Sequence, residues 1–121
     1  MPQISIEYSA NAADVFDARA FAPVVHEHLI AIAGAELAAC KSRLIRHEDY
    51  VIGDGAEANA MIHIDVKILS GRTDEQKQRL GAAIMSSLRE SVESATALNL
   101  QLTVDVRDTD REFYHKSWCS G

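Results

Sequence analysis

Apolar and polar residues alternate along several short stretches of the chain. Gln3–Tyr8, Met61–Leu69 and Leu100–Arg107 each place apolar residues at every second position. A period of two is typical of a strand that buries one face. A further strand is predicted over about Lys41–His47. We therefore expect four strands, most of them with one apolar and one polar face.

Between the strands of each pair, apolar residues recur at helical spacing. The second predicted helix begins after Thr73 as N-cap, and Gln76 three positions later completes a capping box. Its apolar stripe consists of Leu80, Ile84, Leu88 and Val92, with Met85 beside it. The first predicted helix buries Phe21, Val24, Val25, Leu29 and Ile32. Pro23 cannot lie deep inside a straight helix, so we expect a late start or a kink there, and Gly34 can end the helix.

The order strand, helix, strand thus occurs twice and predicts an α+β fold. We expect a fused double β-α-β arrangement, with a four-stranded mixed sheet, both helices on one face and right-handed crossovers. Residues 1–121 would form a single domain made of two units, about 2–52 and 59–107, followed by a C-terminal tail. The turn Gly53–Gly55 separates the two units. The polar sheet face and open strand edges favour an oligomer over a monomer with a solvated face.

Composition narrows the possible partners. The chain has 121 residues and a net charge of −6, which argues against nucleic acid as a partner. No apolar run is long enough to span a bilayer, and the first residues do not resemble a secretion signal. We therefore expect a cytoplasmic protein without a membrane partner. Cys40 and Cys119 form neither a metal-binding spacing nor a dense disulfide framework, which suits a reducing compartment.

Two features carry candidate chemistry. Removal of Met1 would leave Pro2 with a free secondary amine, and a neutral amine near physiological pH is a competent general base. Burial or a neighbouring cation would lower the pKa of such an amine further. Arg72 lies where a predicted strand gives way to a helix, in the run Gly71–Lys77. A helix start also presents unpaired N–H groups to an anion.

These residues resemble a known family. The repeated β-α-β pattern, Met1-Pro2 and the stretch Ile68–Lys77 resemble the tautomerase superfamily, and the second half resembles 4-oxalocrotonate tautomerase. The whole chain looks more like the 5-carboxymethyl-2-hydroxymuconate Δ-isomerases. The segments that carry this likeness are Met1-Pro2 with Glu7, Ser42-Arg43, Asp54-Gly55, Leu69 to Arg72, and the Lys116 tail.

The resemblance implies a role for each matching residue. Pro2 would be the general base, and Arg72 would bind a substrate carboxylate. A second cation on the strand after the first helix would help to hold the substrate. This position falls on Lys41 or Arg43, which point to the same face of a strand. Lysine in place of arginine keeps the charge but loses the planar bidentate fork. Because Ile62 stands where the second unit would have its proline, each chain would hold one catalytic amine.

The resemblance also implies a reaction without cofactor or metal. Pro2 would shift a proton in a 2-hydroxymuconate-type polycarboxylate and yield its unsaturated keto isomer, within a homotrimer. This step belongs to the degradation of aromatic compounds such as homoprotocatechuate. Two alternatives stay open: another proline-dependent tautomerase, dehalogenase or hydratase of simpler substrates, and a non-catalytic trimeric binding protein. The tail Phe113–Trp118 would either line a neighbouring subunit's site or pack aromatic side chains on the surface.

Overall fold

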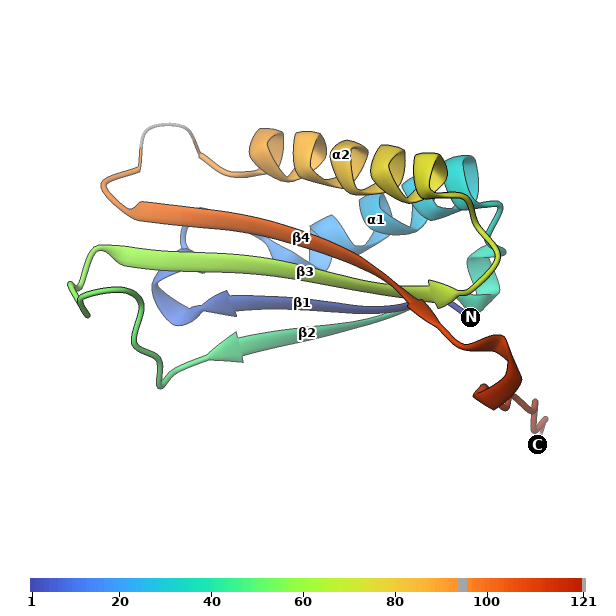
Figure 1. Cartoon of the computed structure of the whole chain (residues 1–121). Helices are drawn as coiled ribbons and strands as arrows, with labels where there is room; N and C mark the ends of the chain where they lie inside the picture. The colour runs from blue at the N-terminus through green and yellow to red at the C-terminus, as the bar shows by residue number, and fades with distance from the viewer. Residues whose placement is uncertain (94–95, 121) are drawn as a thin grey trace.

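The computed structural model describes residues 1–93 and 96–120. Six main elements follow one another along the chain (Figure 1). They are β1 (Gln3–Ser9), α1 (Ala18–Ala33), β2 (Lys41–His47), β3 (Asn59–Leu69), α2 (Asp74–Ser91) and β4 (Asn99–Thr109). Short 3-10 turns occupy Ala10–Ala12, Leu37–Ala39 and Arg111–Phe113. The four predicted strands and both predicted helices are confirmed, with strand ends that differ by one or two residues.

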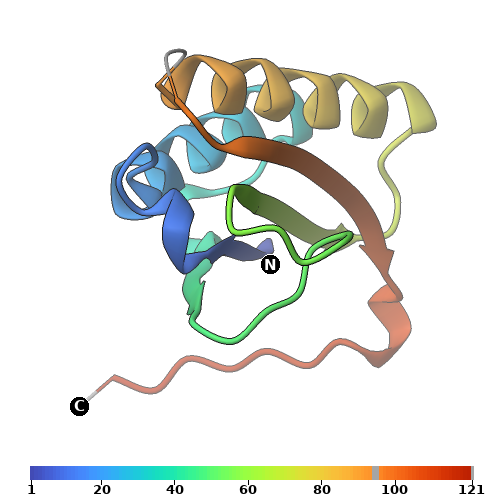
Figure 2. The same ribbon diagram turned by 90° about the vertical axis from the view of Figure 1, so that its left-hand side faces the viewer.

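The strands form one four-stranded sheet in the order β2-β1-β3-β4. β1 runs parallel to β2, β3 runs parallel to β4, and the central pair β1 and β3 is antiparallel. Both helices lie on the same face of the sheet (Figures 1 and 2). The predicted α+β class with a mixed sheet and helices on one face is therefore confirmed. Neither helix combines the length and apolarity that crossing a bilayer requires, over the residues described.

The core lies between the sheet and the two helices. The apolar positions of the central strands are sealed from solvent, since Ile4, Ile6, Ile62 and Ile64 are each 0% exposed. Fully burying one such side chain contributes about 1.5–3 kcal/mol. The helices supply the opposing layer of this core, which includes Phe21, Val25, Leu29, Leu80, Ile84 and Leu88. The buried side chains of the strands and those of the helices thus form one cluster.

The helix ends follow local sequence signals. Thr73 caps α2: its hydroxyl accepts from the Gln76 backbone N–H at 3.1 Å, and the Gln76 side chain accepts from the Thr73 N–H at 3.0 Å. α1 ends at Gly34, whose φ of 67° is a left-handed conformation that glycine adopts without strain. The expected late start of α1 is wrong. The helix begins at Ala18 and contains Pro23, because the Asp17 carboxylate accepts from the Ala20 N–H and caps a turn before the proline.

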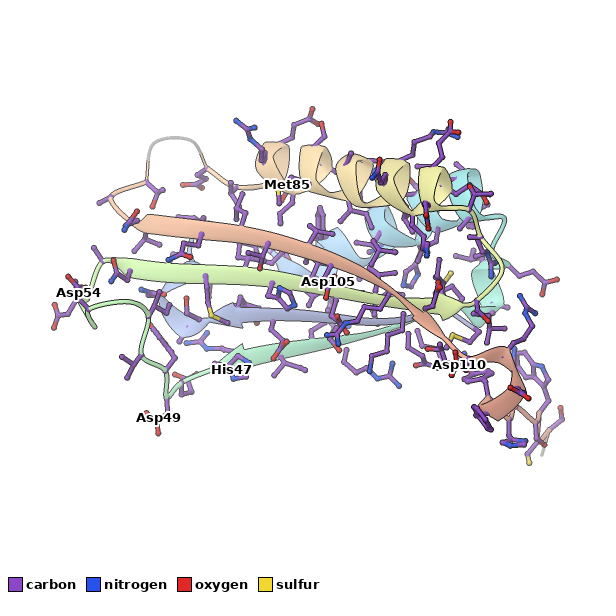
Figure 3. All side chains as sticks on the ribbon, in the orientation of Figure 1. His47, Asp49, Asp54, Met85, Asp105 and Asp110 are labelled. Carbon is purple, nitrogen blue, oxygen red and sulfur yellow. The ribbon has the colours of Figure 1, made fainter. Side chains whose placement is uncertain are left out.

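The face of the sheet turned away from the helices, called the outer face below, carries polar side chains that pair across strands. His47 of β2 lies 3.0 Å from the Glu7 carboxylate of β1. Asp65 of β3 lies 2.7 Å from the Arg107 guanidinium of β4 and is only 9% exposed. Figure 3 shows side chains on both faces, with Met85 on the helical layer and Asp110 where β4 passes into the tail. The tail itself lies on the side of the sheet away from the helices (Figures 1 and 2).

Replacement of Thr73 with alanine tests the capping box. Thr73→Ala removes the hydroxyl that accepts from the Gln76 N–H, so we expect a loss of about 0.5–2 kcal/mol in unfolding free energy. Urea denaturation followed by circular dichroism at fixed protein concentration measures this loss. Gln78→Ala, on an exposed position of the same helix, is the matched control. Equal stability of the two variants would show that the cap contributes nothing.

Candidate active site

Strand pairing brings the candidate residues to one end of the sheet. In the β1–β3 pair Gln3 lies opposite Lys67, so the start of β1 lies beside the end of β3, where the Arg72 loop begins. In the β1–β2 pair Gln3 lies opposite Lys41, so β2 begins at the same end. Pro2, Arg72 and Lys41 come from three separate stretches of sequence. The register alone places them around the N-terminus.

Pro2 is buried and held in place by the backbone. Its carbonyl oxygen accepts a hydrogen bond from the Lys41 N–H at 3.1 Å, so the first strand is anchored one residue before it begins. The free α-amino group in this structure belongs to Met1, and it stands one residue ahead of the nitrogen that Pro2 would expose after Met1 removal. The pKa of this amine is lowered by burial first, then by the positive charges of Lys41, Lys116 and Arg72. The amine thus stands in cationic and partly desolvated surroundings.

Lys41 and Arg43 lie on the same face of β2 but have different neighbours. The Lys41 ammonium donates to the Ala39 carbonyl at 2.8 Å and is the cation with the largest effect on the terminal amine. The Arg43 guanidinium donates to the side-chain oxygen of Gln3 on the outer face. Lys41 therefore lies close to the amine, and Arg43 lies one step further along the strand. Both of the alternatives left open by the sequence border this end of the sheet.

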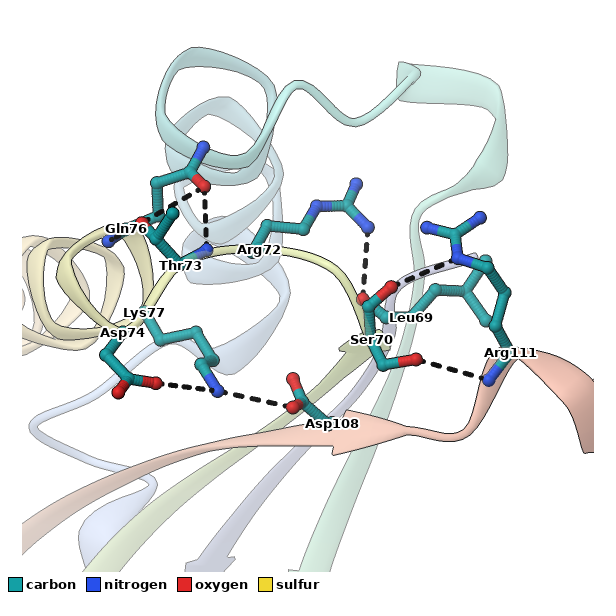
Figure 4. Close-up of polar contacts among 9 residues, drawn as sticks. All are labelled: Leu69, Ser70, Arg72, Thr73, Asp74, Gln76, Lys77, Asp108 and Arg111. Carbon is teal, nitrogen blue, oxygen red and sulfur yellow. Dashed lines mark hydrogen bonds and ion pairs between the residues drawn. The ribbon is translucent and has the colours of Figure 1, made fainter.

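Arg72 is attached to the backbone of two other segments. Its Nε donates to the Ala33 carbonyl at the end of α1 at 3.1 Å. Its Nη1 donates to the Leu69 carbonyl at 3.2 Å, as Figure 4 shows. These two hydrogen bonds tie the end of α1 to the end of β3. A guanidinium has five N–H donors, so others stay available for a ligand.

The start of α2 uses two of its backbone N–H groups within the chain. The capping box uses the backbone N–H groups of Thr73 and Gln76 within the chain. Asp74 and Glu75 in the first turn add negative charge at the same place. The acidic side chains of this turn therefore disfavour an anion at the helix start.

A cavity of about 400 Å³ opens on the outer face beside the N-terminus. Its walls include Met1, Gln3, Arg43, Lys67 and Tyr114. A larger cavity of about 680 Å³ lies at the opposite end of β1, near Tyr8 and Asp17, and none of the candidate residues line it. We therefore place the site beside the smaller cavity, which Met1 and Arg43 line; Pro2, Lys41 and Arg72 are not among the residues that line it.

Sequence reasoning did not assign the tail to the chain's own site. Tyr114 accepts a hydrogen bond from the Gln3 side chain at 3.4 Å, and Lys116 is close enough to lower the pKa of the terminal amine. Phe113 and Trp118 are each 72% exposed. The polar residues of the tail therefore border the site of the same chain, and two of its aromatic side chains lie on the surface, while the contact with a neighbouring subunit's site stays a prediction. One signal in the sequence pointed to the contact between Gln3 and Tyr114: the alternation of Gln3–Tyr8 places Gln3 on the polar face of the sheet.

Other polar candidates have structural partners. His26 lies 2.8 Å from the Ser42 hydroxyl, and His28 lies 2.8 Å from the Ser87 hydroxyl. Burial raises the pKa of the Cys40 thiol, which keeps it in the less nucleophilic protonated form. Among the described residues no group of three metal-ligating side chains comes together. The candidate functional groups at this end of the sheet are therefore the terminal amine and the cationic side chains.

Comparison with solved structures supports the fold. The chain is similar to a 5-carboxymethyl-2-hydroxymuconate isomerase from Deinococcus radiodurans, with 19% identity, a TM-score of 0.87 and coverage of 96% of this chain and 88% of that chain. A 5-carboxymethyl-2-hydroxymuconate delta-isomerase has 18% identity and a TM-score of 0.76, over 98% of this chain and 89% of that chain. A fused 4-OT described as a symmetric trimer has 18% identity and a TM-score of 0.69, over 95% and 93% of the two chains.

Sequence comparison identifies the family. Among curated protein sequences no match is found. The family model of 5-carboxymethyl-2-hydroxymuconate isomerase matches residues 2–118, nearly the whole chain. The resemblance drawn from Met1-Pro2 and Ile68–Lys77 is thereby confirmed. The chain belongs to the 5-carboxymethyl-2-hydroxymuconate isomerase family and is an isomerase.

Proposed function

We propose that this isomerase converts a 2-hydroxymuconate-type polycarboxylate, 5-carboxymethyl-2-hydroxymuconate, into its unsaturated keto isomer, with the Pro2 nitrogen as general base. The observation that carries the proposal is the position of the amine. The N-terminal amine is partly buried, and Lys41, Lys116 and Arg72 lie near enough to lower its pKa. An amine in these surroundings is neutral at a lower pH than an ordinary chain end, and the same cations attract a carboxylate.

Met1 bears directly on this proposal. Met1 is one wall of the outer-face cavity, and Pro2 follows it at the start of β1. Removal of Met1 would enlarge the cavity and leave the Pro2 nitrogen at its edge. With Met1 retained, the Pro2 nitrogen is part of an amide and has no basic lone pair. The proposed enzyme is therefore the chain that begins at Pro2.

The proposed reaction moves one proton and needs no electron acceptor. The Pro2 nitrogen takes the proton from the enol oxygen, the O–H electrons form the new C=O bond, and the adjacent double bond shifts. The protonated amine then returns the proton to carbon, so a C–H bond forms and the amine is neutral again. Negative charge that develops on the enol oxygen is stabilised by the nearby cations Arg72 and Lys41. Both also hold substrate carboxylates in a fixed orientation.

We further propose that the chain assembles as a homotrimer. The sheet ends at β2 on one side and at β4 on the other, so its two edges have no strand partner within the described chain. The outer face carries polar pairs such as Glu7–His47 and Asp65–Arg107 over the apolar sheet layer. Unpaired edges and a crowded polar face are features that assembly about an axis would cover. The fused 4-OT with a similar fold is itself a symmetric trimer.

The assembly proposal is tested by sedimentation. At micromolar protein we expect one species with the mass of three chains of 13.3 kDa each. The processed protein and a variant that retains Met1 should sediment alike, because the N-terminal residue lies outside the strand edges. A 13.3 kDa monomer at that concentration would contradict the trimer.

Arg72→Ala measures how much this side chain contributes to catalysis and how much to stability. We expect kcat/KM on a polycarboxylate enol to fall at least tenfold, because a charge-assisted hydrogen bond contributes on the order of 1.5–3 kcal/mol. Stability should also fall by about 1–3 kcal/mol, since the bonds to Ala33 and Leu69 are lost. Arg79→Ala removes the same charge from an exposed position of α2 and serves as the control. Unchanged kinetics in Arg72→Ala would assign the carboxylate to Lys41 and Arg43 instead.

The pH dependence of activity tests the base. A protonated amine cannot accept a proton, so kcat/KM should rise with pH and level off above the amine's pKa. Burial and the cations lower the pKa of the Met1 amine, and the Pro2 nitrogen would lie among the same cations, so we expect a midpoint below the ordinary α-amino range of about 7.7–8.0. The processed protein is compared with a variant that retains Met1, which should fold alike and be inactive. Equal activity of the two forms would remove Pro2 from the mechanism.

A further inference from the structure

A tryptophan of the C-terminal tail holds a cation although it lies on the surface. Trp118 is 72% exposed, as is Phe113 earlier in the tail. The Lys116 ammonium lies over the Trp118 ring, 4.8 Å from its centre. The face of an indole ring attracts a cation electrostatically. Trp118 therefore restricts the movement of the Lys116 side chain, and this contact gives the exposed ring a role within its own chain.

Hydrogen bonds fix the path of the tail before it reaches Lys116. The Arg111 Nε donates to the Ser70 carbonyl at 3.0 Å, and the Arg111 backbone N–H donates to the Ser70 hydroxyl at 3.3 Å (Figure 4). Three residues after Arg111, the Gln3 side chain of β1 donates to the Tyr114 hydroxyl at 3.4 Å. The tail is therefore attached both to the end of β3 and to the start of β1.

These attachments bring Lys116 to the N-terminus. Gln3 directly follows Pro2, so Tyr114 contacts β1 one residue away from the proposed base. The backbone is extended at Tyr114, with φ −97° and ψ 120°, and side chains two residues apart in an extended chain point to the same side. The pKa of the Met1 amine is lowered by burial first, and the Lys116 charge is among the cations that lower it further. Pro2 thus lies between a residue that contacts the tail and an amine that is close to Lys116.

We infer that the tail is part of the proposed site of its own chain, with Arg111 and Trp118 as positioning residues that hold the Lys116 ammonium beside the Pro2 nitrogen. This inference rests on the proposed function, in which Pro2 is the base. A nearby cation disfavours the protonated form of an amine. The tail therefore lowers the pH at which the proposed base becomes neutral.

Charged and titratable groups from several elements surround the same amine. They are Lys41 at the start of β2 with the adjacent Cys40, Arg72 in the loop before α2, and Arg43, Lys67, Asp65 and Tyr114 in the cavity wall. Lys41 and Arg72 donate to backbone carbonyls at the ends of the main elements. Lys116 differs from these two cations, because it belongs to the tail, outside the sheet. Its charge can therefore be changed without breaking the contacts that hold the sheet.

Titration of the amine tests the role of Lys116. Protein that begins at Pro2 is labelled with ¹⁵N-proline, and the NMR shift of the Pro2 nitrogen is followed against pH; Pro23 is an amide and does not titrate. Lys116→Gln should raise the midpoint by about 0.3–0.5 pH unit, the effect of one charge several ångströms away in surroundings close to water. Lys116→Arg keeps the charge and should keep the midpoint. In about 1 M salt, where the screening length is about 3 Å, the difference should vanish.

A double variant tests the positioning residues. Among the described residues, the cations that lower the pKa of the Met1 amine include Lys116 but not Arg111, so the charge of Arg111 has no direct effect. Arg111→Gln should nevertheless raise the midpoint, and the double variant with Lys116→Gln should shift it no further than Arg111→Gln alone. Additive shifts would overturn the role of Arg111. Trp118→Ala should also raise the midpoint, whereas Phe113→Ala removes an equally exposed aromatic ring of the tail and should not. Equal midpoints in these two alanine variants would overturn the role of Trp118.

Kinetics on the same variants separate this inference from the proposed function. The pH profile of kcat/KM on an enol substrate should follow the NMR midpoint in every variant. NMR midpoints that move as expected, with a kinetic profile that does not follow them, would overturn Pro2 as the base and leave the placement of the tail standing. Equal NMR midpoints in all variants, with activity that still requires a free Pro2 nitrogen, would overturn the inference about the tail alone.

Discussion

The structure depends on one pairing, the antiparallel contact between β1 and β3. Each half of the chain forms a parallel strand pair covered by its own helix, but only this central contact joins the halves into one sheet. Its register places Ile6 opposite Ile64, with both side chains 0% exposed under the helices. A slip by one residue would turn these isoleucines to the outer face and bring Glu7 or Asp65 into the core. The same register sets the N-terminus beside the end of β3, so fold and site follow from one constraint.

The site brings several positive charges together in a protein of net negative charge. Their mutual repulsion costs free energy, and neighbouring backbone carbonyl oxygens offset part of this cost. Burial lowers the pKa of the terminal amine most, and the positive charges of Lys41, Lys116 and Arg72 lower it further. Two of these cations are fixed by backbone carbonyls: Lys41 by Ala39 and Arg72 by Ala33 and Leu69. Carbonyl oxygens carry partial negative charge, so they stabilise a cation without neutralising it. The ammonium and guanidinium groups thus keep their full charge for an anionic ligand.

The elements were predictable from sequence because their signals are local. Alternation located the strands, and the spacing of Thr73 and Gln76 located the start of α2 within one residue. The contacts of the site were less predictable, because they join residues far apart that share no periodic pattern. Arg72 bonds to Ala33, 39 residues away, and Tyr114 bonds to Gln3, 111 residues away. Pro23 illustrates the same limit within a helix: the Asp17 cap and the packing of Phe21 and Val25 outweigh the missing N–H donor.

The loop Ser70–Arg72 connects stability to the proposed chemistry. Gly71 has a φ of 124°, which a residue with a side chain rarely adopts. A Cβ atom added at this glycine would lie 3.7 Å from the Arg111 guanidinium. This turn lets the Ser70 carbonyl face the tail while Arg72 points back toward α1. A side chain at position 71 would strain the turn through this φ, although a Cβ would meet Arg111 only at an ordinary van der Waals distance. The tail and the guanidinium of Arg72 thus both depend on a turn that glycine makes without strain.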